Sequence, residues 1–178
     1  MELRTEEAKI IILSGKARSG KDTSMQIIKK KYESLSKKVI CLFYASYIKE
    51  YAKRISDWDG NDETKPRTLL QVLGTDIIRN TIDNKFFINR TIEDIKVYSK
   101  FFDVIIIGDA RFPEEIEDIK KVFSNVVSVH ITRKDMNILT ETEKQHITET
   151  ALDNYKEYDY VINNDGPIEE LESKLSEI

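Results

Sequence analysis

Five short apolar runs, alternating with longer segments of helical periodicity, constrain the fold of this chain more than any other feature. Four of the runs are continuously apolar and rich in β-branched side chains; the five cover residues 9–14, 38–45, 102–109, 126–133 and 158–163. Such runs are typical of parallel strands covered on both faces. Apolar residues recur at helical spacing in residues 21–34, 46–55, 66–80, 85–99, 113–123 and 167–178. This order predicts an α/β fold with a doubly wound, five-stranded parallel sheet.

Two polar segments, residues 56–65 and 134–150, interrupt this alternation. The 178 residues suit a single domain with one core. Long polar connections inside a compact domain are more often functional lids than spacers. We therefore interpret both segments as mobile inserts of one domain.

The charge balance argues against a polyanionic partner. The chain has 28 Lys and Arg against 32 Asp and Glu, a net charge of -4, so any phosphate binding has to be local and not a general attraction to nucleic acid. No apolar stretch approaches the roughly 18 residues of a membrane span. The single cysteine, Cys41, lies in an apolar run and can form no internal disulfide, which fits a core position in a reducing compartment. We expect a soluble, cytoplasmic protein that binds neither nucleic acid nor membrane.

The stretch ILSGKARSGKDTS, residues 12–24, follows the first apolar run and opens the first helical segment. Gly15, Gly20 and Lys21 have the spacing of a phosphate-binding loop, in which backbone N–H groups wrap a phosphate chain at the positive end of a helix. Lys21 can reach the outer phosphate oxygens. The alternative, a tight turn with a solvated lysine, is disfavoured because spacing and context agree.

Two carboxylates are candidates for magnesium. Asp22 stands where a hydroxyl usually follows the lysine, and a carboxylate can bind Mg²⁺ directly or through water. Asp109, in VIIIGDARFPEE, ends the third apolar run, where ligands collect in open α/β sheets, and could orient Mg²⁺ or accept a proton. Arg111 could clamp a phosphate with two hydrogen bonds. The other interpretation of Asp109 and Arg111 is a helix cap with a surface salt bridge to a neighbouring glutamate.

A third motif, KPRTLLQVLGTDIIRN, places Arg67, Gln71 and Arg79 at successive spacings of four and eight residues, on one side of an α-helix. Two arginines and an amide could read a monophosphate and its base. Taken alone, a solvated helix face explains the pattern equally well. Trp58, in the first polar insert, either stacks on a base or anchors its loop.

Together these motifs resemble the bacteriophage and bacterial deoxynucleoside monophosphate kinases of the P-loop nucleoside-monophosphate-kinase superfamily. The resemblance spans most of the chain and rests on LSGKARSGKDT, PRTLLQVLGTDIIR, IIIGDARFPEE, HITETAL and DYVINNDGPIEEL. The loop is specific for the superfamily. The arginine–glutamine helix and the aspartate–arginine strand end together restrict the resemblance to the deoxynucleoside monophosphate kinases within it. The resemblance implies one P-loop kinase domain over residues 1–178, with an acceptor-binding helical region over about 46–99 and a lid over 134–150.

The resemblance also implies roles for individual residues. Transfer of the ATP γ-phosphate would involve Lys21, Arg18, Asp109 and Arg111. ATP would be bound by Gly15, Lys16, Ser19, Gly20, Lys21, Asp22, Thr23, Arg133, Asn164 and Gly166. The acceptor would be bound by Lys49, Arg67, Gln71, Arg79, Arg111 and His146. ATP and Mg²⁺ are the implied co-substrate and cofactor, with the metal at Asp22 and Asp109; small nucleotides are the implied partners, and a homodimer is left open.

Two alternatives stay open at this point. Animal-type phosphomevalonate kinases resemble the same loop, including the aspartate after the lysine, and their acceptor is also an anion. A nucleotide switch or binding module is disfavoured because Asp109 is not followed by the x-x-Gly of such switches, and Asn164 stands where a base-reading lysine is expected. A lone histidine such as His146 is more often incidental than functional. The sequence therefore favours ATP-dependent phosphotransfer to a (deoxy)nucleoside monophosphate.

Overall fold

The computed structural model describes residues 3–134 and 147–178. Within them, five strands form one sheet in the order β2-β3-β1-β4-β5, and all neighbouring strands are parallel. The strands are β1 (Lys9–Ser14), β2 (Val39–Leu42), β3 (Val104–Ala110), β4 (Val126–Thr132) and β5 (Tyr160–Asn163). From the central β1 the chain crosses to β2 and β3 on one side, and then to β4 and β5 on the other. The predicted doubly wound α/β architecture is confirmed.

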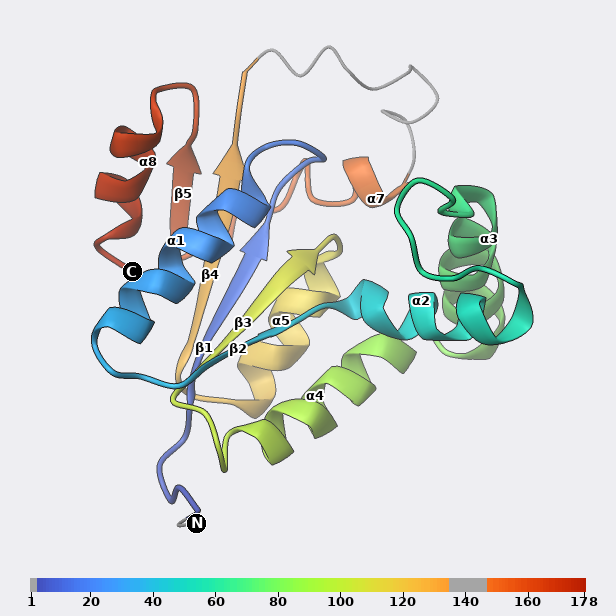
Figure 1. Cartoon of the computed structure of the whole chain (residues 1–178), viewed down its shortest axis with the longest axis horizontal. Helices are drawn as coiled ribbons and strands as arrows, with labels where there is room; N and C mark the ends of the chain where they lie inside the picture. Colours follow the sequence, from blue (N-terminus) through green and yellow to red (C-terminus); the bar gives the residue numbers. More distant parts are fainter. Residues whose placement is uncertain (1–2, 135–146) are drawn as a thin grey trace.

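Helices cover both faces of this sheet (Figure 1). On one face lie α1 (Lys21–Ser34) and α8 (Ile168–Leu175). On the other face lie α4 (Phe86–Tyr98) and α5 (Pro113–Val122). Successive residues of β1 enter opposite halves of the core: Ile10 and Ile12 face α4 and α5, whereas Ile11 and Leu13 face α1 and α8. All four are fully buried, which explains the continuous apolar run. Cys41 packs, partly buried, against the α1 side.

A further group of helices lies to one side of the sheet (Figure 1) and coincides with much of the predicted acceptor-binding region. Its members are α2 (Tyr44–Ile55), α3 (Arg67–Gln71) and η1 (Val72–Ile82). They enclose a small core of Ala52, Trp58 and Leu73. Trp58 is 8% exposed, and its Nε1 donates a 2.9 Å hydrogen bond to the carbonyl oxygen of Asn61. The indole therefore anchors the first polar insert.

The η1 segment is a π-helix, so the prediction of a continuous α-helix over residues 66–80 is wrong. A π-helix bonds each N–H five residues back and has a wider turn. At its end, Asp83 N donates such a bond, 2.9 Å long, to the Ile78 carbonyl. At Gly74 the helix passes so close to α2 that an added Cβ would lie 2.8 Å from Ile48 Cδ1. Residues four or eight positions apart, which share one side of an α-helix, are therefore not expected to share one side of this segment.

The junction after the second strand also differs from its prediction. A strand was expected through residue 45, yet β2 ends at Leu42 and α2 begins at Tyr44. The cause is distant in sequence: the Asp109 carboxylate accepts hydrogen bonds from Tyr44 N and Ala45 N, at 2.8 and 2.9 Å. These bonds satisfy two N–H groups that a helix start otherwise leaves unpaired, so the helix begins earlier.

The predicted lid is described only in part. Its final four residues form the short helix α7 (Ile147–Thr150), whereas residues 135–146 lie outside the described residues. Among the residues that the structure describes, no helix has the length and apolar character needed to cross a bilayer.

Candidate active site

The loop after β1 lies at the carboxyl edge of the sheet, where ligands bind in open parallel sheets. It turns at Gly15 and Gly20, whose φ angles are 142° and 100°. A Cβ at Gly15 would collide with the Ile131 carbonyl oxygen and lie 2.7 Å from Ser19 Oγ, and a Cβ at Gly20 would collide with the Asn164 side chain. The loop thus follows a tight course that only glycine permits at these two positions.

Lys21, the first residue of α1, is buried beside this loop. The side chain is 7% exposed, and its Nζ lies 2.7 Å from the carbonyl oxygens of both Gly15 and Lys16, to which it donates. Burial, and then the neighbouring Arg111 charge, lower the pKa of Lys21 to about 8. Ser19 Oγ is also buried and has no hydrogen-bond partner within the described part of the chain. A buried cation beside an unpaired hydroxyl is suited to receive an anion.

Other predicted residues of the loop are more exposed. Arg18, Asp22 and Thr23 are exposed, and Arg18 has a φ of 60°, uncommon for a bulky side chain. Lys16 forms a half-exposed ion pair of 2.8 Å with Asp153. Asp22 also borders the cavity beside the loop. These side chains lie on the solvent side of the loop.

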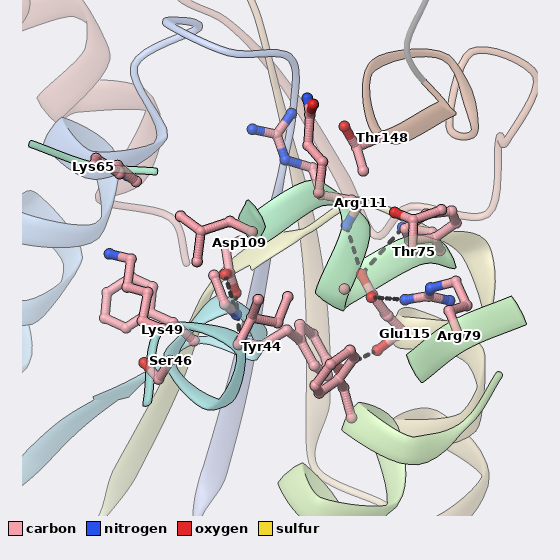
Figure 2. Close-up of a pocket in the computed structure, with 18 of the residues that line it drawn as sticks. Tyr44, Ser46, Lys49, Lys65, Thr75, Arg79, Asp109, Arg111, Glu115 and Thr148 are labelled. Atoms are coloured by element: carbon pink, nitrogen blue, oxygen red, sulfur yellow. Dashed lines mark hydrogen bonds and ion pairs between the residues drawn. The ribbon is translucent and has the colours of Figure 1, made fainter. Parts of the chain in front are cut away.

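A cavity of about 440 Å³ adjoins the loop (Figure 2). Its wall includes four residues of the predicted acceptor set: Lys49, Gln71, Arg79 and Arg111. The rings of Phe43, Phe87 and Phe112 contribute apolar surface. Arg67, by contrast, is exposed at the first residue of α3 and does not line this cavity. Cations together with aromatic surface suit a small anion that carries an apolar or aromatic group.

Asp109 lies between the loop and the cavity, and both of its carboxylate oxygens are engaged (Figure 2). Oδ1 accepts from Tyr44 N and Oδ2 from Ala45 N. Burial raises the pKa of Asp109, while the two backbone hydrogen bonds oppose that rise. The carboxylate thus holds the start of α2, the helix that carries Lys49. Asp109 therefore caps a helix, as the second interpretation of the sequence predicted. The capped helix is α2, however, and not α5, which follows β3.

Glu115, on α5, organises the wall of the cavity. It is 3% exposed, and its carboxylate accepts hydrogen bonds from Arg79 Nη2 (2.6 Å), Arg111 N (2.7 Å) and Phe112 N (3.1 Å) (Figure 2). Burial raises the pKa of Glu115 to about 7, against the opposing effect of the Arg79 charge. The sequence interpretation considered this region only for a surface salt bridge and missed its buried role. Glu115 fixes one cavity arginine and the turn that bears the other.

Arg111 joins the loop to the cavity. Besides lining the cavity, its Nη1 lies 3.3 Å from the Gly15 carbonyl oxygen and 2.6 Å from Glu149 Oε1, and donates to both. The other oxygen of Glu149 accepts a 2.8 Å hydrogen bond from Ala17 N in the loop. Glu149 was not among the predicted site residues, and its contact with Ala17 spans 132 positions of sequence.

The remaining predicted site residues are Asn164, Arg133, Gly166 and His146. Asn164, after β5, donates a 2.9 Å hydrogen bond from Nδ2 to the Ser19 carbonyl oxygen, so this segment contacts the loop. Arg133 and Gly166 are exposed after β4 and β5. His146 lies outside the described residues.

Comparison with known proteins identifies relatives by sequence. A model of the deoxynucleotide monophosphate kinase family matches residues 37–175. The deoxynucleotide monophosphate kinase of Escherichia phage RB69 is 34% identical over 119 residues, which are 66% of this chain and 46% of the relative. That of Enterobacteria phage T4 is 30% identical over 115 residues, 64% of this chain and 45% of the relative. The chain thus spans about half the length of the curated relatives that it matches.

Solved kinases share the fold at much lower identity. The APS kinase of Mycobacterium tuberculosis, solved with AMPPNP and APS, superposes with a TM-score of 0.59 at 11% identity and 96% coverage of both chains. The shikimate kinase of Bacteroides thetaiotaomicron gives 0.54 at 17% identity and 94% coverage of both chains. These likenesses concern the fold alone, and they agree with the predicted α/β fold with a five-stranded parallel sheet.

Proposed function

Because the chain belongs to the deoxynucleotide monophosphate kinase family, we propose that it transfers the γ-phosphoryl group of ATP to a deoxynucleoside monophosphate, releasing ADP and the deoxynucleoside diphosphate. The observation that carries this proposal is the position of Arg111, which contacts the loop after β1 and also lines the neighbouring cavity. One guanidinium therefore borders both a donor site and an acceptor site. Phosphoryl transfer between two bound substrates requires such a junction.

The loop supports a donor site for ATP. The loop turns at two glycines just before α1, where backbone N–H groups could bind phosphate, and the buried Lys21 supplies a cation beside it. On binding, phosphate oxygens would replace the carbonyl oxygens that Lys21 contacts in the free protein. The donor contacts that we propose are Gly15, Lys16, Ser19, Gly20, Lys21, Asp22, Thr23, Arg133, Asn164 and Gly166.

The cavity supports an acceptor site for a nucleoside monophosphate. Arg79 and Arg111 would hold the phosphate, because a guanidinium matches two phosphate oxygens at once. Gln71 would bind the base by its amide, and Lys49, which also lines the cavity, adds positive charge. Arg67, which is exposed in this state, would join them when the polar insert closes over the acceptor. His146 would contribute from the lid.

The residues present fit a magnesium ion held mainly by substrate phosphates. In the described ranges, no group of three or more His, Cys, Asp and Glu side chains could hold a metal by itself. Mg²⁺ commonly takes one or two carboxylates together with phosphates and water, and Asp22 is exposed between the loop and the cavity. Asp22 and Thr23 would hold the ion, with Asp109 the weaker ligand because its oxygens already accept backbone bonds. When bound, magnesium neutralises charge on the transferring phosphoryl group.

The side chains of this protein position the reactants and stabilise charge. Lys21 and Arg111 would stabilise the transferring phosphoryl group, and Arg18 would reach it from the exposed side of the loop. The attacking atom belongs to the acceptor phosphate, so no covalent nucleophile of the protein is needed. Closure of the cavity would exclude water, which otherwise intercepts the phosphoryl group.

We also propose that the enzyme works in the cytoplasm on small nucleotides. A homodimer stays an expectation, and light scattering of the purified chain would test it. None of the matches reported above favours phosphomevalonate as acceptor or a nucleotide switch.

A coupled assay of ADP release tests the proposed function. Wild-type protein, Mg²⁺ and ATP are combined in turn with each common ribo- and deoxyribonucleoside monophosphate and with phosphomevalonate. We expect turnover with one or more deoxynucleoside monophosphates and slow ATP hydrolysis without an acceptor. Turnover with phosphomevalonate alone would show that the acceptor is misidentified.

A further inference from the structure

The Glu149 carboxylate lies between a backbone amide of the loop after β1 and the guanidinium of Arg111. Oε2 accepts a 2.8 Å hydrogen bond from Ala17 N of the loop, and Oε1 accepts a 2.6 Å hydrogen bond from Arg111 Nη1. The side chains are 11% exposed for Glu149 and 25% for Arg111, so the pair is shielded from solvent. A phosphoryl group bound at the junction of donor and acceptor would use the same amide and the same guanidinium. The carboxylate therefore occupies an anion position of the free protein.

The segment that bears Glu149 is fixed to the domain by further contacts. Asp153 pairs with Lys16 at 2.8 Å on the other side of the loop. Leu152 and Tyr155 pack against the core on the α4 and α5 side of the sheet. The position of the Glu149 carboxylate is therefore a product of the fold and not of a single surface contact.

Resting on the function proposed above, we propose that Glu149 is a positioning residue of the transfer reaction. Before substrate binds, it holds Arg111 at the junction of the two sites; when nucleotide binds, it yields the Ala17 amide to a phosphoryl oxygen. Two anions cannot share one amide donor, and their charges repel at hydrogen-bonding distance. The carboxylate thus competes with the donor phosphates for the loop while it orients the arginine that the reaction needs.

One substitution should therefore change binding and turnover in opposite directions. Glu149→Gln keeps the size of the side chain but removes its charge, and the amide nitrogen cannot accept a hydrogen bond. Inorganic tripolyphosphate should bind about tenfold more tightly, because one charge-assisted hydrogen bond no longer competes. The kcat of phosphoryl transfer should fall about tenfold, because Arg111 loses its orientation. A merely structural Glu149 would instead weaken binding and turnover together.

Isothermal titration calorimetry with tripolyphosphate on the full chain tests the binding half. Glu157→Gln is the matched control, since it removes a negative charge from the segment that follows α7 without touching the Ala17 amide, Lys16 or Arg111. The Glu157 side chain is exposed, so the Kd of this variant should stay within about twofold of wild type. Tighter binding by Glu149→Gln alone supports the proposal. Unchanged or weaker binding by Glu149→Gln, or equal tightening in both variants, overturns it.

Steady-state kinetics test the positioning half. Glu149→Asp retains the charge on a shorter side chain, so its kcat should fall while its tripolyphosphate affinity stays near that of wild type. An unchanged kcat in Glu149→Gln would overturn the role in orienting Arg111. The titration needs neither an acceptor nor phosphoryl transfer. A wild-type protein that phosphorylates no deoxynucleotide would therefore refute the proposed function and leave the binding result readable.

Discussion

The guanidinium carbon of Arg79 lies 3.7 Å from the centre of the Phe112 ring. The stacking fixes the plane of the guanidinium, and the 2.6 Å hydrogen bond to Glu115 fixes its rotation within that plane. Because both partners are present in the free protein, the proposed acceptor site is ordered before an acceptor arrives. Less side-chain freedom is then lost on binding.

Replacing Glu115 should weaken the acceptor site selectively. The side chain of Glu115→Gln offers one accepting oxygen, which cannot serve Arg79 together with the two backbone amides. We expect the KM for the acceptor to rise about tenfold, with the KM for ATP changed less than about twofold. Steady-state kinetics measure both, and Glu114→Gln on the exposed side of the same helix is the matched control. An equal rise in both KM values would mean that Glu115 acts on the whole domain.

The pKa of Glu115 predicts how acceptor use changes with pH. Burial raises it from 4.5 to about 7, so the carboxylate gains a proton as pH falls through 7, which removes its negative charge and turns one accepting oxygen into a donor, and its hold on Arg79 weakens. The KM for the acceptor should therefore rise as pH falls from about 8 to 6, and the profile of Glu115→Gln should lack this component. The effect of pH on the free energy of unfolding has the opposite sign. Because folding raises the pKa of Glu115, the protonated carboxyl group contributes stability in full below about pH 4.5, and this contribution is lost as the pH rises through 7. Identical KM profiles in the two proteins would contradict the assignment.

The lowered pKa of Lys21 predicts that ATP binding weakens at alkaline pH. In the free protein the ammonium loses its proton near pH 8, whereas bound phosphates favour the charged form. The Kd for ATP should rise by up to about tenfold per pH unit above 8, with proton uptake on binding. Calorimetry in buffers of different ionisation enthalpy measures both quantities. Lys21→Arg stays charged throughout, so its Kd, whatever its size, should not follow this trend.

Asp109→Asn should destabilise the protein through the start of α2. An asparagine oxygen can accept from only one of the two amides that the carboxylate now engages, and it carries no charge opposite the helix N-terminus. We expect a loss of about 2 kcal/mol in the free energy of unfolding, measured by urea denaturation. Asp83→Asn is the control: Asp83 accepts from Lys85 N beside α4 but is exposed, so its loss should stay below about 0.5 kcal/mol. Equal losses would remove the special role of Asp109.

Local sequence predicted the conformation of the loop after β1 well because its determinants are local. Gly15, Gly20 and Lys21 lie within seven positions, between an apolar run and a helix, and their conformation follows from steric limits on the backbone. The five strands were predictable for a similar reason: a strand buried on both faces has to be apolar at successive residues.

Contacts between distant segments account for what the sequence did not predict. Glu115 and Glu149 become site residues only when α5 and α7 meet the loop and η1, and a glutamate on a helix carries no local mark of such contacts. The start of α2 depends on Asp109, 65 positions away. The π-helix over Val72–Ile82 has a residue pattern compatible with an α-helix, so periodicity could not distinguish the two windings.

Product analysis with isotopically labelled ATP tests the central claim most directly. The wild-type protein is incubated with Mg²⁺, ATP labelled with ¹⁸O in the γ-phosphoryl group, and the deoxynucleoside monophosphate that gives the fastest ADP release; Lys21→Ala is the inactive control. Mass spectrometry should find the label in the β-phosphoryl group of a deoxynucleoside diphosphate with wild type only. Label recovered solely in inorganic phosphate, or in no product, would contradict the assignment of a deoxynucleoside monophosphate kinase.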